Sequence, residues 1–251
     1  FSMTHYAPRF APIPTVVAIM DLGFLQHPEQ FTAKDFNQLK SWTGYSVRQA
    51  KRIIAISEFT KQDIVKTYSV NPASVTVTPL AYDKKLFKPT PVPAKQPYIL
   101  FLGSLKPNKN VEGLIRAFHL LSTGHLAPST KLVIAGKKAW LYDRIFELVR
   151  SLKLEDRVTF TGFVLDKDKP ALMSGAAAFV MPSFHEGFGI PVLEAMACGT
   201  PVVISKVASL PEVGGTAAIY VNPHDPNSIA SGIKTAIGPD RDKFVQLGLK
   251  R

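Results

Sequence analysis

Short apolar runs alternate with amphipathic helical patterns along nearly the whole of this 251-residue chain. The runs are rich in β-branched and other apolar residues, so we expect them to form strands. The expected strands are residues 15–20, 52–56, 75–78, 98–102, 131–135, 158–160, 176–181, 201–204 and 218–221. The clearest helical patterns between them are residues 36–50, 58–68, 111–121, 141–152 and 228–237. Buried strands joined by helices predict an α/β fold in which parallel sheets carry helices on both faces.

A Pro-rich segment, KPTPVPAKQP at residues 88–97, interrupts this alternation and predicts a stiff linker. It separates residues 1–87 from residues 98–251. The first part is too short for a complete doubly wound domain, because it supplies only about three strands. We therefore expect a partial Rossmann-like domain followed by a second Rossmann-like domain.

The stretch richest in candidate functional residues is PSFHEGFGIPVLEAMACGTPVV, at residues 182–203. A predicted strand runs into a Gly-rich turn that opens a helix near Ile190, and two acids, Glu186 and Glu194, flank the turn. Gly199 is placed to end this helix in a left-handed cap. Helical side chains lean toward the helix N-terminus, so Glu194 would face back to the turn, toward Glu186 in the preceding loop.

The N-terminus of a helix is suited to anions, because its backbone N–H groups are unsatisfied and the helix dipole favours negative charge. Two acids beside it do not suit bare phosphate, but they suit a ligand that also offers hydroxyl groups, as a nucleotide sugar does. The alternative is that Glu194 is an ordinary surface residue and Glu186 an acid placed by the dipole. The glycines and the flanking strands favour the ligand site.

Other turns follow the carboxyl ends of predicted strands, where open α/β sheets bind their ligands. These turns contain Gly103, Ser104 and residues 106–110, then Gly136, Lys137 and Lys138, and then Gly162, Phe163 and Val164. We expect them to line one rim of a crevice together with the acid-flanked turn.

The net charge of +11 is compatible with nucleic acid, anionic lipid or an anionic substrate as partner. Nucleic acid is disfavoured, because the basic residues are dispersed and no aromatic–basic platform is visible. A peripheral contact with an anionic membrane stays open. The single cysteine, Cys198, suits a reducing, cytoplasmic compartment. The histidines lack metal-ligand spacing, so no metal is expected, and His185 would either touch a ligand or lie on the surface.

The stretch HEGFGIPVLEAMACGTPVV resembles the signature of the retaining glycosyltransferases of family 4 (glycosyl transferases group 1), in which seven residues separate two Glu residues. Residues 19–31, 56–64, 98–118, 131–140 and 158–164 agree with that family in order and spacing. The resemblance implies the GT-B fold, with a partial N-terminal, acceptor-side domain at residues 1–87 and a C-terminal nucleotide-sugar-binding domain at residues 98–251. Compared with the family, the chain looks cut at both ends.

The resemblance also implies residue roles. Glu194 matches the acid that accepts hydrogen bonds from the ribose hydroxyls, and Glu186 matches the acid that contacts the transferred sugar. Lys109 matches a diphosphate-binding lysine. The other expected donor-binding residues are Gly103, Ser104, Gly136, Lys137, Phe163, Val164, Gly187, Phe188 and Gly189. Among these, the backbone at Phe163 and Val164 would hold the base.

The chain departs from the family pattern at the diphosphate and at the sugar. Many members have Arg where Ser104 and Asn108 stand, which leaves Lys109 of the usual basic clamp. Members also commonly have His where Met20 stands. Met forms no useful hydrogen bond, so that role is vacant and Asp21 is the only polar candidate at this turn. We therefore expect Asp21 and Glu186 to be the catalytic residues.

The activity that the resemblance implies is transfer of a sugar from a nucleoside diphosphate to a glycan or lipid-linked acceptor, with retention of configuration. It requires neither a cofactor nor a metal. Three other functions remain open. The chain could be a non-catalytic fragment that binds nucleotide sugars, a structural or regulatory fragment that sits on membranes or nucleic acid, or a GT-B sugar-nucleotide epimerase.

Overall fold

The computed structural model describes residues 1–3, 5–93, 96–124, 126–137 and 142–251. The chain divides into two compact units, and each has its own sheet and its own core. The N-terminal unit consists of Phe1–Leu80, His185–Gly189 and Val207–Glu212. The second unit consists of Ala81–Phe184, Ile190–Lys206 and Val213–Arg251.

The N-terminal unit contains a parallel sheet of three strands, as predicted, and their order is β1-β2-β3. Its strands are β1 (Val16–Ile19), β2 (Arg52–Ala55) and β3 (Val75–Val77), and its helices are α1 (Gly23–Gln26), α2 (Ala33–Gln49) and α3 (Glu58–Tyr68). Short 3₁₀ turns occupy Pro28–Gln30 and Pro72–Ser74. Thr32 and Ser57 cap α2 and α3 through their side-chain oxygens, which fixes where these helices begin.

The second unit contains a parallel sheet with the strand order β6-β5-β4-β7-β8-β9. Its strands are β4 (Tyr98–Leu102), β5 (Lys131–Ala135), β6 (Val158–Gly162), β7 (Ala178–Met181), β8 (Val202–Ser205) and β9 (Ala218–Val221). The main helices are α4 (Val111–Ser122), α5 (Asp143–Ser151), α6 (Lys169–Ser174), α7 (Ile190–Ala197), α9 (Pro226–Ile237) and α10 (Arg241–Leu249). The 3₁₀ turns are Pro107–Lys109, Asp166–Asp168 and Gly215–Ala217, and the short helix α8 (Leu210–Gly214) begins in the N-terminal unit and ends in the second.

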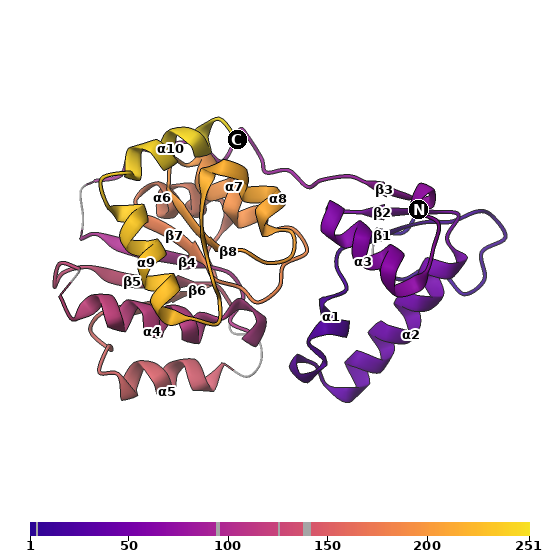
Figure 1. Ribbon diagram of the computed structural model, residues 1–251, viewed down its shortest axis with the longest axis horizontal. Coiled ribbons are helices and arrows are strands. Elements are labelled where there is room, and N and C mark those ends of the chain that lie inside the picture. The colour runs from indigo at the N-terminus through magenta and orange to yellow at the C-terminus, as the bar shows by residue number, and fades with distance from the viewer. Residues whose placement is uncertain (4, 94–95, 125, 138–141) are drawn as a thin grey trace. The chain divides into compact units, whose positions relative to one another are not determined.

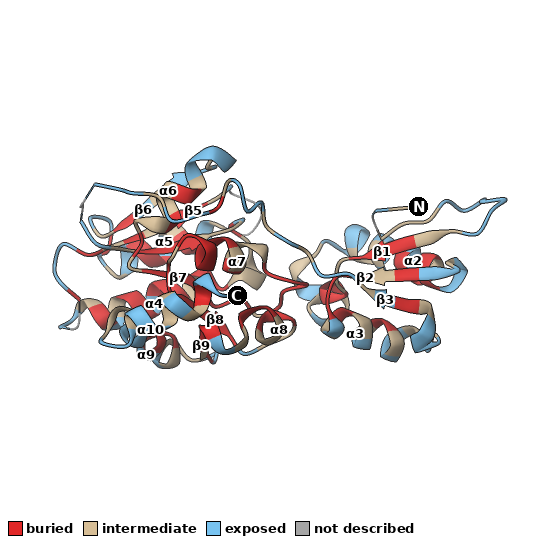
Figure 2. Ribbon diagram, turned by 90° about the horizontal axis from the view of Figure 1, so that it is seen from above, coloured by how far each residue is buried: buried red, intermediate tan, exposed pale blue. Residues whose placement is uncertain are grey.

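Helices cover both faces of the larger sheet, with α4, α5 and α9 on one face and α6 and α7 on the other (Figure 1). Every residue of β7 and β8 is buried, which is why these strands read as continuous apolar runs (Figure 2). Phe101, Phe118 and Phe179 are among the largest fully buried side chains of this unit. The parallel α/β, Rossmann-like fold predicted from the alternation is confirmed.

Some boundaries differ from the prediction. Strand β6 extends to Gly162, two residues beyond the predicted end, because its edge position lets Gly162 continue the pairing with β5. Helix α5 begins at Asp143, while the predicted start at residue 141 and the site candidate Lys138 lie outside the described residues. No helix in the described part of the chain combines the length and the hydropathy needed to span a bilayer.

Gly136 allows the loops after β4 and β5 to close over each other. It has a φ of +142°, and an ideal Cβ at this position would lie only 1.9 Å from the carbonyl oxygen of Gly103. Any other residue would therefore combine a disfavoured backbone conformation with a clash against backbone that cannot easily move.

We predict that Gly136→Ala destabilises the fold by about 3 kcal/mol or more, the sum of backbone strain and overpacking. Gly124→Ala is the matched control, because Gly124 has a φ of +146° but no neighbour within 4 Å of its ideal Cβ. The control should lose only about 1 kcal/mol, from strain alone. Urea unfolding of both variants measures the difference in the free energy of unfolding. Equal losses of stability in the two variants would contradict the proposed clash.

Candidate functional site

The carboxyl edge of the larger sheet is where the strand order reverses. Strand β4 has β5 on one side and β7 on the other, which makes the loops after β4 and β7 the expected place for a ligand. Backbone hydrogen bonds tie the neighbouring loops together, from Gly103 N to Ala135 O at 2.9 Å and from Gly136 N to Gly162 O at 2.8 Å. The structure thus brings the predicted residues Gly103 and Gly136 side by side.

Asn110 joins the loops after β4, β7 and β9. Its side-chain Nδ2 donates to Pro182 O at 3.0 Å and to Pro223 O at 2.7 Å, and its Oδ1 accepts from Gly113 N at the start of α4. Phe184 N also donates to Asn108 O at 2.8 Å. The segment on which Lys109 lies is therefore fastened to the segment that leads into the acid-flanked turn.

The predicted polar residues of this edge differ in their exposure. Ser104 is exposed, whereas Lys109 is half-buried in the turn Pro107–Lys109. Lys137 places its Nζ 4.5 Å from the centroid of the Phe163 ring, a cation–π contact, and Phe163 is 59% exposed. Such a large exposed aromatic ring beside a lysine offers a surface for a flat ligand.

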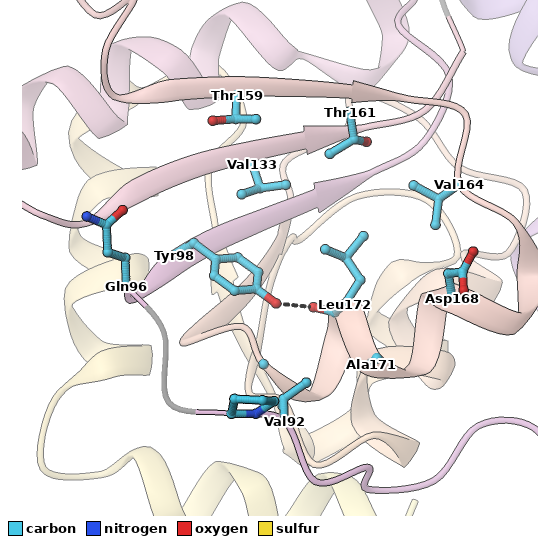
Figure 3. A pocket seen from close by; sticks show the side chains of 12 residues that line it. Val92, Gln96, Tyr98, Val133, Thr159, Thr161, Val164, Asp168, Ala171 and Leu172 are labelled. Atoms are coloured by element: carbon cyan, nitrogen blue, oxygen red, sulfur yellow. Dashed lines mark hydrogen bonds between the residues drawn. The ribbon is translucent and has the colours of Figure 1, made fainter.

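A cavity of about 470 Å³ lies on the sheet face beside α6 (Figure 3). Tyr98, Val133, Thr159 and Thr161 line it from the strands, and the Tyr98 hydroxyl donates to Leu172 O at 2.6 Å across it. Burial raises the pKa of Tyr98 to about 12. Val164 is the one predicted site residue among its lining residues, so this cavity is largely distinct from the predicted site.

Glu194 lies on α7 and is 8% exposed, so its interpretation as an ordinary surface residue is wrong. Burial raises the pKa of Glu194, while the nearby Lys169 lowers it and Asp166 raises it. The helix begins at Ile190, as predicted, and ends before Gly199, which adopts the predicted positive φ of +75°.

The predicted residues Glu186, Gly187, Phe188 and Gly189 belong to a loop that clusters with the N-terminal unit. Glu186 is 9% exposed, and the Ser209 hydroxyl donates to the carbonyl oxygens of Glu186 at 2.8 Å and Phe188 at 3.1 Å. Gly189 has a φ of +104°, which explains why glycine stands immediately before α7.

Asp21 organises the turn after β1, because its Oδ1 accepts from Gly23 N at 2.8 Å. His185 is 4% exposed and packs on this turn, so the expectation of a surface position for it is wrong. Asp21 is the polar side chain that the turn itself carries. The imidazole of His185, which comes from a different loop, packs beside it. The sequence signal for this was weak: a histidine directly before Glu186, separated from Asp21 by most of the chain.

Glu194 gives a pH-dependent prediction. Because the pKa of Glu194 is raised above its usual 4.5, its contribution to stability is complete at low pH and is lost as the pH rises through the raised value. Glu194→Gln removes this titration, so the variant should gain stability relative to the native protein as the pH rises above 4.5. Urea unfolding across this range measures the two free energies, and parallel curves would contradict the prediction.

Comparisons with known proteins agree with this architecture. The family profile described as Glycosyl transferases group 1 matches residues 83–246. O-antigen chain mannosyltransferase B of Escherichia coli is 32% identical over 235 residues, which cover 90% of this chain and 61% of that protein. The chain thus spans about three fifths of the length of this curated relative.

Two solved structures resemble the chain in fold. HepE of Anabaena, in complex with UDP and glucose, gives a TM-score of 0.79 at 22% identity and is matched over 94% of this chain and 66% of its own. WaaG, a glycosyltransferase involved in lipopolysaccharide biosynthesis, gives a TM-score of 0.80 at 18% identity. The match covers 96% of this chain and 71% of WaaG. The fold is therefore GT-B, and the chain belongs to the glycosyl transferases group 1 family.

Proposed function

We propose that this chain is the donor-binding part of a glycosyltransferase that moves a sugar, with retention of configuration, from a nucleoside diphosphate to a glycan or lipid-linked acceptor. Mannose is the proposed sugar, because the curated relative is named as a mannosyltransferase of the O-antigen chain. A nucleoside-diphosphate donor is supported by HepE, which was solved with UDP and glucose.

The observation that carries the proposal is the burial of Glu194 on α7, which is 8% exposed and whose pKa is raised by that burial. Burying a carboxylate is costly, and a ligand that supplies hydrogen-bond donors would offset that cost. The two hydroxyls of a ribose are such donors. We propose that Glu194 binds them, and that the loops at Gly103, Gly136 and Lys109 hold the diphosphate.

The transferred sugar is assigned to Glu186 and Asp21, and the N–H groups of Gly187, Phe188 and Gly189 would serve the sugar and the diphosphate. Negative charge builds up on the departing diphosphate as the sugar bond breaks. Oriented N–H groups and lysines stabilise such charge without reorganising during the reaction. Phe163 and Val164 would hold the base, with the Phe163 ring stacking on it beside Lys137.

A non-catalytic nucleotide-sugar-binding fragment is the second candidate. Met20 favours it, because a thioether cannot hydrogen-bond a sugar at a position next to Asp21. The two candidates differ in one result. A glycosyltransferase moves labelled sugar to an acceptor, and by our proposal it does so with EDTA present, whereas a binding fragment holds the donor unchanged.

We also propose that the protein acts at the cytoplasmic face of a membrane and contacts anionic lipid. The net charge of +11 supports this, as do the exposed side chains of Phe10 (94%) and Ile13 (72%), which follow Arg9 closely in the sequence. Apolar side chains with neighbouring cations are suited to a lipid interface.

We predict that at least one of UDP, GDP and ADP binds the native chain, and that Glu194→Ala weakens it by roughly 1–3 kcal/mol, the scale of lost hydrogen bonds to a charged group. Calorimetric titration of both proteins measures the difference. Glu147→Gln, on the exposed surface of α5, is the control and should bind like the native protein. Equal affinities of the native protein and Glu194→Ala would take the ribose role away from Glu194.

The lipid contact predicts salt-sensitive sedimentation with vesicles that contain phosphatidylglycerol, and weaker sedimentation with vesicles of phosphatidylcholine alone. The variant Phe10→Ser with Ile13→Ser should sediment several-fold less, because it loses apolar insertion but keeps all charges. Sedimentation that is the same for both lipids, or for both proteins, would argue against this surface.

A further inference from the structure

We propose that His185 is a positioning residue for sugar transfer, which holds the loop His185–Gly189, and with it Glu186, against the turn that carries Asp21. The inference rests on the proposed function, because the placement of Glu186 matters only if a sugar is handled there. All the groups concerned belong to the N-terminal unit.

The imidazole and the carboxylate meet on the backbone of Gly23. An ideal Cβ at Gly23 would lie 2.7 Å from Cδ2 and 3.0 Å from Nε2 of His185, and 3.1 Å from Oδ1 of Asp21. The same Oδ1 accepts the hydrogen bond of Gly23 N. The histidine ring therefore packs directly on the turn that Asp21 organises, in space that exists only because residue 23 has no side chain.

A second contact fastens the other side of Glu186. An ideal Cβ at Gly187 would lie 2.6 Å from Met20 O and 3.1 Å from Oδ2 of Asp21. Both chain neighbours of Glu186 thus press on the same turn, while Ser209 holds the Glu186 carbonyl. Loosening this loop would displace Glu186 itself, and a shift of about 1 Å at a reacting group can cost on the order of 100-fold in rate.

The surroundings favour a neutral imidazole. The ring of Phe59 on α3 stands edge-on at 5.7 Å from the His185 ring, and the ring of His27 stands at 6.1 Å. Burial lowers the pKa of His185 below its usual 6.5, against the opposing pull of Asp21, Asp63 and Glu186, and His27 lowers it further. A neutral imidazole can pack on the turn without adding a buried charge.

The same cluster is not arranged as a metal centre. No group of three or more His, Cys, Asp or Glu residues within the described ranges could hold a metal ion. Asp63 is instead engaged by Gln26, whose Nε2 donates to its Oδ2 at 2.8 Å. The cluster is therefore interpreted as a packed polar support for the loop.

The test compares His185→Phe, which keeps a flat ring but no nitrogen, with His185→Gln, which restores a hydrogen-bonding group. In the full chain, His185→Phe should lower kcat for sugar transfer by about tenfold or more, with the donor KM changed by less than about twofold. His185→Gln should recover part of the loss. The native kcat should fall toward acid pH as the imidazole becomes charged, and His185→Gln should lack this limb. His119→Gln on α4 is the control and should behave as native.

The outcomes separate the two levels of the proposal. If native protein binds no nucleoside diphosphate and transfers no sugar, the proposed function fails and this inference falls with it. If native protein transfers sugar and His185→Phe keeps the native kcat and pH profile, this inference alone is overturned. If His185→Phe does not fold, His185→Gln and Asp21→Asn are compared singly and in combination. Effects on kcat that do not add in the double variant support the shared contact, and effects that add refute it.

Discussion

The arrangement of the candidate site on the larger sheet depends on how closely the loops after β4 and β5 approach each other at the carboxyl edge. The carbonyl of Gly103 occupies the space that a side chain on Gly136 would need. Because that space is free, the pairing of β4 with β5 continues beyond the strands, and Leu105 N still donates to Lys137 O at 2.9 Å. The loops then form one continuous rim, which backbone hydrogen bonds and the side chain of Asn110 hold together.

Under the proposed function, the protein gives up stability for binding at this site. Glu194 is buried, and this burial raises its pKa although the nearby Lys169 lowers it. In the N-terminal unit, His185 is likewise buried and packs on the turn that carries the half-buried Asp21. Natural proteins place buried polar and charged groups mainly where function requires them, and the burial of both Glu194 and His185 within one sequence motif supports the proposed chemistry.

Much of the fold was predictable because its signals are local. Buried parallel strands such as β7 and β8 are apolar on both faces, and the end of α7 is marked by Gly199. The extension of β6 to Gly162 was missed, because a glycine near a strand end is more typical of a turn. The short helices α1 and α6 have too few residues to show a periodic pattern.

The candidate site was predictable only in part. The lean of Glu194 toward its own N-terminus follows from helix geometry, but its burial depends on elements far away in sequence. The position of His185 depends on the absence of a side chain at Gly23, which no local pattern can reveal. Contacts between residues that are distant in sequence decide which polar groups of a motif are buried, and this is the information that a single sequence lacks.

Hydrogen exchange of the backbone amides, with and without a nucleoside diphosphate, tests the central claim most directly. The account predicts slower exchange on binding in the loops at residues 103–110, 136–137 and 162–164 and at the start of α7, since the ligand would be bound by this rim. Protection confined to the cavity beside Tyr98, or none at all in the presence of saturating UDP, GDP or ADP, would contradict it.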